Sequence, residues 1–123
     1  MTRLWRVLGA LVVGLAATLV VASPAHATTV NFVKTVEWPN GYIIEATVTN
    51  NLVTPITGWE VGFELPAGEY VELSWNVRVG QAEPHYVCVN TEHNGSLRPG
   101  ESTTFGFVVI TTNKPGMPII LYP

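Results

Sequence analysis

One run of alternating residues constrains the fold of this chain more than any other. Large apolar side chains occupy every second position from Trp59 to Leu65, with glutamates or a glycine between them. A period of two is the signature of a β-strand that buries one face and exposes the other. Pro66-Ala67-Gly68 follows at once and predicts a turn. We therefore expect a half-buried strand, with Trp59 in the core.

Other short segments have the same character, and Gly, Pro and Asn residues separate them. No segment of useful length shows a helical period. This pattern favours an all-β fold in a single domain, an antiparallel β-sandwich of two sheets with an immunoglobulin-like or jelly-roll-like arrangement. Residues 70–79 form one strand or two, because Trp75-Asn76 interrupts the pattern, and 80–84 are expected to be a loop. The remaining predicted strands are 30–37, 42–49, 85–89, 104–110 and 119–122.

Residues 1–27 are predicted to be a secretory signal peptide rather than part of the fold. Arg3 and Arg6 form a short basic region, an uncharged apolar run covers 8–21, and Ala25-His26-Ala27 is a cleavage site of the A-x-A type. The apolar run is shorter than the roughly 20 residues that a membrane span needs. We expect cleavage after Ala27 and secretion of 28–123 as an extracellular, monomeric domain, free of the membrane. A retained anchor is the alternative.

The charge of residues 28–123 excludes one class of partner. Four Lys and Arg stand against nine Glu, with no Asp, so the formal net charge is −5. An acidic domain without a basic cluster is a poor candidate for binding nucleic acid. No Cys/His spacing suggests a zinc site, and we expect no metal and no cofactor.

Cys88 is the only cysteine and therefore cannot form an internal disulfide. It stands in the apolar run Tyr86-Val87-Cys88-Val89, which is typical of a strand. We expect a buried small side chain. A disulfide between two chains is the alternative.

Two further tryptophans stand where a large apolar ring has little to pack against. Trp38 precedes the turn Pro39-Asn40-Gly41, and Trp75 stands at the break in 70–79. Because tryptophan is costly to expose, two of them at turns suggest a flat ligand that stacks on the indole rings. The alternative is that each ring caps an end of the sandwich.

Several different short motifs, rich in aromatic, glycine and asparagine residues, are spread over roughly 36–111. In chain order they are Trp38-Pro39-Asn40-Gly41-Tyr42, Ala46-Thr47-Val48-Thr49-Asn50, Gly58-Trp59-Glu60-Val61, Leu65-Pro66-Ala67-Gly68, Ser74-Trp75-Asn76, Asn94-Gly95-Ser96-Leu97, Pro99-Gly100 and Thr104-Phe105-Gly106-Phe107. In order and spacing they resemble the family 2 carbohydrate-binding modules of secreted bacterial cellulases, xylanases and chitinases. The resemblance implies a β-sandwich that binds polysaccharide, with cellulose first and chitin next, and that has no catalytic activity.

The resemblance also implies a site. Cellulose-binding members present three coplanar surface tryptophans, of which Trp38 and Trp75 match two. The third position, just before an Asn-Gly pair, is His93 here. An imidazole is a smaller stacking platform and is charged when protonated, so we expect weaker binding or a different polymer. Xylan-binding members have an Arg where this chain has Gly41, which favours the cellulose-binding type.

The polar groups around the rings complete the expected site. Asn40, Asn76 and Asn94 stand near the rings in sequence and could form hydrogen bonds with sugar hydroxyls. Turn formation explains Asn40 and Asn94 equally well. The positions of the polar residues that usually flank the strip hold Glu45, Thr104 and Val108, and Val108 offers no hydrogen bond. In many members a disulfide joins the two ends of the domain, and a single cysteine cannot form one.

Three other functions remain open from the residues alone. Glycoside hydrolysis needs paired carboxylates, and Glu60 and Glu64 share one strand face. A copper-dependent polysaccharide monooxygenase would need cleavage after Ala25, so that an N-terminal His26 and either His85 or His93 hold the metal. A secreted sandwich that binds protein at a cell surface has the same fold and the same export signal. The non-catalytic polysaccharide-binding module is the interpretation that we favour.

Overall fold

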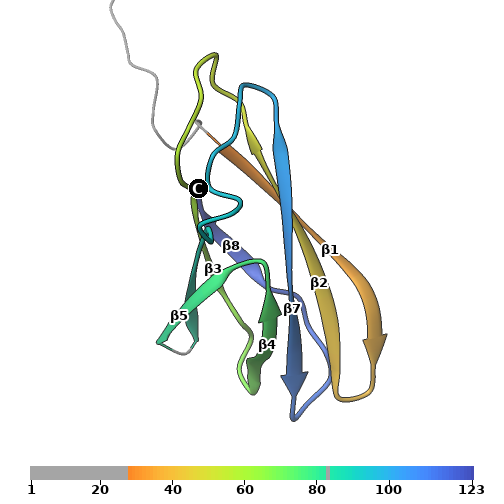
Figure 1. The fold of residues 1–123 in the computed structure, drawn as a ribbon. Coiled ribbons are helices and arrows are strands. Elements are labelled where there is room, and N and C mark those ends of the chain that lie inside the picture. Colours follow the sequence, from red (N-terminus) through yellow and green to blue (C-terminus); the bar gives the residue numbers. More distant parts are fainter. Residues whose placement is uncertain (1–27, 83) are drawn as a thin grey trace, which may run out of the picture.

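The computed structural model of the protein describes residues 28–82 and 84–123. The predicted signal peptide, with its cleavage site and His26, lies outside the described residues. All regular elements within them are strands (Figure 1). These are β1 (Thr28–Trp38), β2 (Gly41–Asn50), β3 (Glu60–Glu64), β4 (Glu69–Trp75), β5 (Arg78–Ala82), β6 (His85–Val89), β7 (Ser102–Thr111) and β8 (Ile119–Tyr122).

The strands form two antiparallel sheets of four strands each, in the orders β1-β2-β7-β4 and β5-β6-β3-β8. Only the β1–β2 and β5–β6 connections stay within one sheet, and every other connection passes from one sheet to the other. The prediction of an antiparallel β-sandwich is confirmed. The β1-β2-β7-β4 sheet has two edge strands, β1 and β4, and both become important for the candidate site.

The predicted break near Trp75-Asn76 is confirmed, because β4 ends at Trp75 and β5 begins at Arg78. Asn76 adopts a left-handed backbone with φ 60°, a conformation that asparagine tolerates better than most residues. The prediction of a loop from residue 80 is wrong for its first half. Gly80 and the two residues after it continue β5, because the apolar strand β6 supplies an antiparallel partner.

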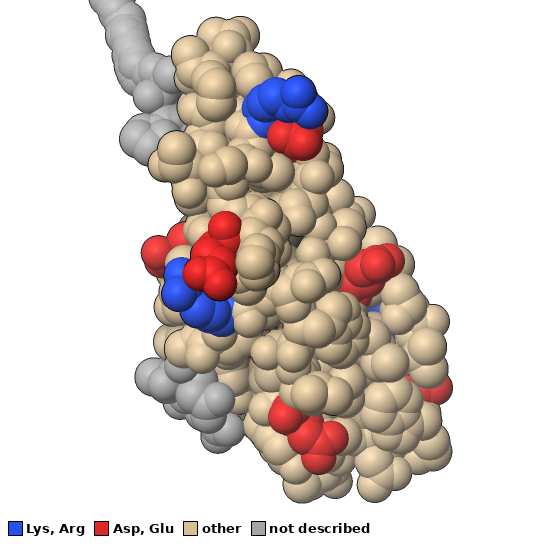
Figure 2. All heavy atoms as spheres, viewed as in Figure 1, with Lys and Arg blue, Asp and Glu red and all other residues tan. Residues whose placement is uncertain are grey.

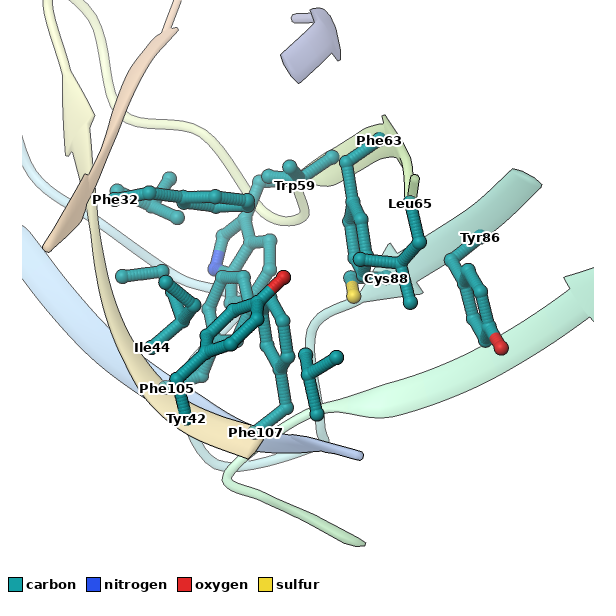
Figure 3. Close-up of a cluster of buried hydrophobic side chains, with 14 of the residues drawn as sticks. Phe32, Tyr42, Ile44, Trp59, Phe63, Leu65, Tyr86, Cys88, Phe105 and Phe107 are labelled. Carbon is teal, nitrogen blue, oxygen red and sulfur yellow. The ribbon is translucent and has the colours of Figure 1, made fainter. Parts of the chain in front are cut away.

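The core lies between the sheets, and aromatic rings stack and pack edge to face within it among aliphatic side chains (Figure 3). Phe63 from one sheet stacks on Phe107 from the other, with ring centroids 4.8 Å apart and planes 8° from parallel. Trp59 is 5% exposed and stacks on Phe105 at 5.4 Å. The prediction that Trp59 is a core residue is confirmed.

Cys88 lies in the same core with no solvent exposure, on β6. The prediction of a buried cysteine is confirmed. Burial raises the pKa of its thiol to about 12, because a thiolate would lose its water there. The side chain therefore acts as a small apolar residue in the packing.

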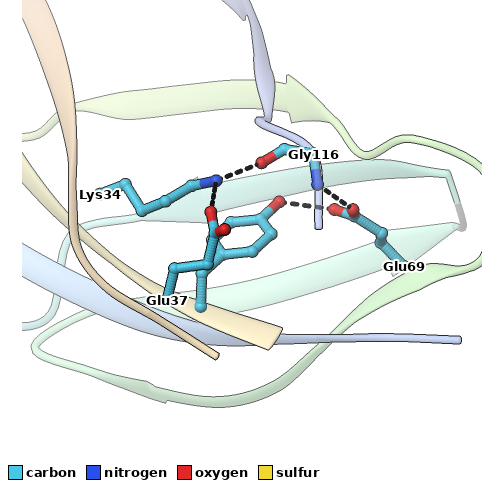
Figure 4. Close-up of polar contacts among 5 residues, drawn as sticks. Lys34, Glu37, Glu69 and Gly116 are labelled. Carbon is cyan, nitrogen blue, oxygen red and sulfur yellow. Dashed lines mark hydrogen bonds and ion pairs between the residues drawn. The ribbon is translucent and has the colours of Figure 1, made fainter. Parts of the chain in front are cut away.

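A buried carboxylate fixes the loop that leads into β8 (Figure 4). Glu69 is 6% exposed, and it accepts hydrogen bonds from the Tyr42 hydroxyl (2.6 Å) and from the Gly116 backbone N–H (2.7 Å). Lys34 Nζ donates to the Gly116 carbonyl (2.7 Å) and pairs with Glu37 (2.6 Å). Burial, and then the bond to Glu69, raise the pKa of Tyr42 well above its usual range. This network joins β1, β2 and β4 to the segment that crosses to the other sheet.

Candidate functional site

Trp38 is the last residue of β1 and faces Gly41, its partner across the turn to β2. The indole lies against the glycine, since a Cβ built at Gly41 would come within 2.9 Å of Trp38 Cζ2. Trp38 is partly exposed, and its ring is supported on one side by the Gly41 backbone. Of the two candidate surface tryptophans, Trp38 is the more buried.

Trp75 is the last residue of edge strand β4, and its side chain is exposed. It pairs with Gly106 on β7, and a Cβ at Gly106 would overlap the indole. The ring therefore lies on the backbone of the neighbouring strand instead of projecting into water. Such a ring is held in place without a ligand, so a ligand that stacked on it would cost little conformational entropy.

Both rings lie on the outer face of the β1-β2-β7-β4 sheet. Alternation along a strand requires this, because Phe105 and Phe107 on either side of Gly106 point into the core. Gly41 pairs with Ile110, which is four residues along β7 from Gly106 and therefore on the same face. The two supporting glycines are therefore about 14 Å apart along the strands and one strand spacing, about 4.8 Å, apart across them.

His93, the third predicted platform, lies in the turn between β6 and β7 and is highly exposed, with 86% of its side chain accessible. Its backbone N–H donates to Thr91 Oγ1 at 3.2 Å. The ring lies 3.7 Å from a Glu92 oxygen that is equally exposed. The structure thus brings the His93 turn to the surface, but it shows no support beneath the imidazole like the glycines beneath the two indoles.

Asn94 connects this turn to the rest of the site. Its side-chain amide donates to the Asn76 carbonyl at 2.7 Å, and its Oδ1 accepts a bond from the Thr91 backbone N–H at 2.8 Å. Its own carbonyl accepts a bond from Trp59 Nε1 at 2.8 Å. Asn94 therefore places the His93 turn beside the residue that follows Trp75 and links both to the core.

The other two predicted asparagines, Asn40 and Asn76, are exposed. The Asn40 carbonyl accepts a bond from the Thr111 backbone N–H at 2.8 Å, which fixes the β1–β2 turn that follows Trp38. Asn76 ends β4 with its left-handed backbone. Contact of either side chain with a sugar stays a prediction.

Most of the surface between the two indoles is not apparent from the sequence. The row halfway between Gly41 and Gly106 is entirely apolar, and of its four residues only Val108 is among the positions that the family resemblance points to. Leu73 is 59% exposed and Val36 is 51% exposed. The row consists of Val36, Ile43, Val108 and Leu73, in the order of the strands β1, β2, β7 and β4.

Charged side chains are scattered over the face shown in Figure 2, with no basic cluster on it. The glutamates considered for hydrolysis lie on the other sheet and have partners there: Glu60 accepts a bond from Tyr122, and Glu64 pairs with His85. Over residues 28–82 and 84–123, no three His, Cys, Asp or Glu side chains come together where they could hold a metal ion. The same residues contain no helix that could span a membrane.

A two-sheet antiparallel sandwich with preplaced aromatic rings on one outer face defines a class of binding module. Within that class, the chain belongs to the family of cellulose binding domains, whose family model matches residues 28–120. The family assignment agrees with the resemblance that the ordered motifs carry.

Relatives include a cellulose/chitin binding protein of Mycobacterium tuberculosis, 37% identical over 95 residues, or 77% of this chain and 66% of the relative. Chitinase C of Streptomyces lividans is 36% identical over 79% of this chain but only 16% of the chitinase. The chain thus spans slightly less than two thirds of the first relative and a small part of the second.

Among solved structures, the chitin-binding domain of Chi18aC from Streptomyces coelicolor is similar, with a TM-score of 0.61 and 31% identity. The match covers 79% of this chain and 92% of that domain. The cellulose-binding domain of ScLPMO10C has a TM-score of 0.63 at 23% identity, over 79% of this chain and 97% of that one, and shows the shared fold.

Proposed function

We propose that this protein is a secreted, non-catalytic module that binds insoluble polysaccharide, cellulose or chitin, with the outer face of the β1-β2-β7-β4 sheet. The observation that carries the proposal is the placement of Trp38 and Trp75. Each indole lies on a glycine of the adjacent strand, and both are on the same outer face. Family membership, and the ligands that the relatives' names state, support the same ligand class.

The physics of such a face is direct. A pyranose ring has an apolar face of C–H groups, which packs on an indole while its hydroxyl groups stay at the edges in contact with water. The stacked area is removed from water, and this supplies the main driving force. The separation of about 14 Å along the strands lets one extended chain cover both rings. His93, Asn40, Asn76 and Asn94 would add lesser contacts at the ends of this line.

Adsorption from solution tests the proposal. The secreted protein is mixed with microcrystalline cellulose, chitin or insoluble xylan, and the protein left in the supernatant is measured. We expect depletion by cellulose or chitin, and its loss in the double variant Trp38→Ala/Trp75→Ala. Tyr122→Ala is the matched control, because Tyr122 on β8 is 37% exposed, close to the 39% of Trp75, but lies in the other sheet.

If the wild-type protein stays in the supernatant with every polymer, the proposal is wrong. A secreted β-sandwich that binds protein at a cell surface then becomes the better interpretation. Equal adsorption of the wild type and the double variant would show that the two indoles are not the site. The intact mass of the secreted chain tests export separately. We expect Thr28 to be the first residue, whereas a chain that begins at His26 would support the copper enzyme.

A further inference from the structure

The apolar row between the two indole platforms lies where a bound chain would pass. The straight line from Gly41 on β2 to Gly106 on β7 crosses the sheet midway between Ile43 and Val108, which are paired. Val36 and Leu73 lie on either side of this line, each on an edge strand and about 7 Å from it. A polysaccharide on both rings would therefore have Ile43 and Val108 beneath it, and Val36 and Leu73 along its two edges.

Irregularities in both edge strands place these two side chains. The register of β1 shifts between Lys34 and Val36, and that of β4 shifts between Val71 and Leu73. In a regular strand, residues two apart share a face, but an extra residue in the ladder changes that relation. Val71 packs against the core, while Leu73 is exposed. Both shifts bring an aliphatic side chain to the same row of the outer face.

None of the four side chains of the row can form a hydrogen bond with a bound chain. In a β-1,4-linked polymer successive sugars are flipped, so the substituents at carbon 2 point alternately to one edge and to the other. In cellulose this substituent is a hydroxyl group, which finds no polar side chain at Val36 or Leu73. In chitin it is an acetamido group, whose methyl would pack on either aliphatic side chain and leave water.

From this arrangement we infer that Val36 and Leu73 make the face selective for N-acetylated β-1,4-glycan, so that chitin binds more tightly than cellulose. The inference rests on the proposed function and specifies its ligand. The methyl of each acetamido group that packs on the row adds apolar contact that a hydroxyl group lacks. Transfer of a methyl-sized group from water corresponds to about a fourfold change in affinity.

Depletion isotherms on chitin and on microcrystalline cellulose test this, with wild type, Leu73→Gln and Val36→Gln compared. We expect wild type to bind chitin at least about fourfold more tightly than cellulose. Each variant should weaken binding to chitin and strengthen or preserve binding to cellulose, so that the ratio falls. Val53→Gln is the control, because Val53 is an aliphatic side chain that is 92% exposed in the loop before β3.

The outcomes separate the selectivity from the function itself. Equal binding of wild type to both polymers, or tighter binding to cellulose, overturns the selectivity and leaves the proposed function standing. A preference for chitin that neither glutamine variant changes overturns the role of Val36 and Leu73. Binding to neither polymer overturns the proposed function, and the inference with it.

Discussion

The indole of Trp75 lies on Gly106, its partner on the neighbouring strand, at a position that leaves no room for a Cβ. Gly106→Val should therefore displace the ring while keeping a residue that favours strands. We expect adsorption to weaken by about 1–3 kcal/mol, the usual range for loss of an aromatic anchor, and Trp75→Ala to match it. Gly80→Val is the control, since no atom lies within 4 Å of a Cβ there. Unchanged isotherms for Gly106→Val would mean that the position of the ring does not matter.

Trp59→Ala should lower the stability of the fold, because Trp59 is a core residue and not part of the candidate binding surface. The variant removes a 5% exposed ring, its stacking on Phe105 and the hydrogen bond from Nε1 to the Asn94 carbonyl. We expect the free energy of unfolding in urea to fall by about 3–5 kcal/mol, as for other large aromatic deletions in a core. Trp75→Ala should melt nearly as wild type does. A Trp59→Ala protein with unchanged melting would contradict the core assignment.

The stability of the protein should be sensitive to the change of a single atom in the buried Glu69 side chain. Glu69→Gln replaces one acceptor with an NH₂ donor, so the amide cannot accept from both Tyr42 and the Gly116 N–H. We expect a loss of about 1–3 kcal/mol in unfolding free energy, the cost of an unsatisfied buried polar group. Exposed Glu72→Gln on the same strand is the control. A double-mutant cycle with Tyr42→Phe should show coupling, and additive effects would argue against the network.

Cys88 should be unreactive in the folded protein. Since burial raises its pKa from 9.0 to about 12, almost no thiolate is present at pH 8, and labelling should occur only after denaturation. The stability that comes from keeping this thiol neutral is fully present below pH 9 and is lost as the pH rises towards 12. Cys88→Ala should lack this alkaline dependence in denaturation curves. Rapid labelling of the native protein, or a dimer that a reductant separates, would contradict the burial.

His93→Trp should strengthen adsorption to cellulose and chitin. The turn that carries His93 is already held beside Asn76 by Asn94, so an indole there would lie near the end of the Trp38–Trp75 line. We expect a gain of about 0.5–1.5 kcal/mol, the scale of an added aromatic contact. Val53→Trp, in the exposed loop between β2 and β3, controls for the added apolar area. If both variants adsorb equally, His93 does not belong to the strip.

Several features of the molecule were predictable because they depend on local pattern. The period-two runs locate most strands within one or two residues and place Trp59 in the core, and the apolar run around Cys88 predicts its burial. The interruption after Trp75 was also predictable, because small polar residues on both sides of it end the strand pattern. These signals involve only neighbouring residues, so they are readable before any tertiary contact is known.

Other features depend on residues far apart in the chain. Glu69 looks like any surface glutamate until the fold brings it to Tyr42, 27 residues earlier. The end of β5 at Ala82 depends on pairing with β6 and not on its own sequence. The glycines beneath Trp38 and Trp75 become ring supports only when the register of the strands is known.

Local sequence pattern is enough to predict an antiparallel sandwich, its core and the candidate rings, because alternation and turn residues act over a few positions. The outward orientation of Val36 and Leu73, on the same face as the rings, depends instead on how the strands pair. A single register shift in each edge strand reverses the face on which the following residues lie, and no local sequence pattern indicates such a shift. The apolar character of the surface between the two indoles therefore depends on the register of the strands.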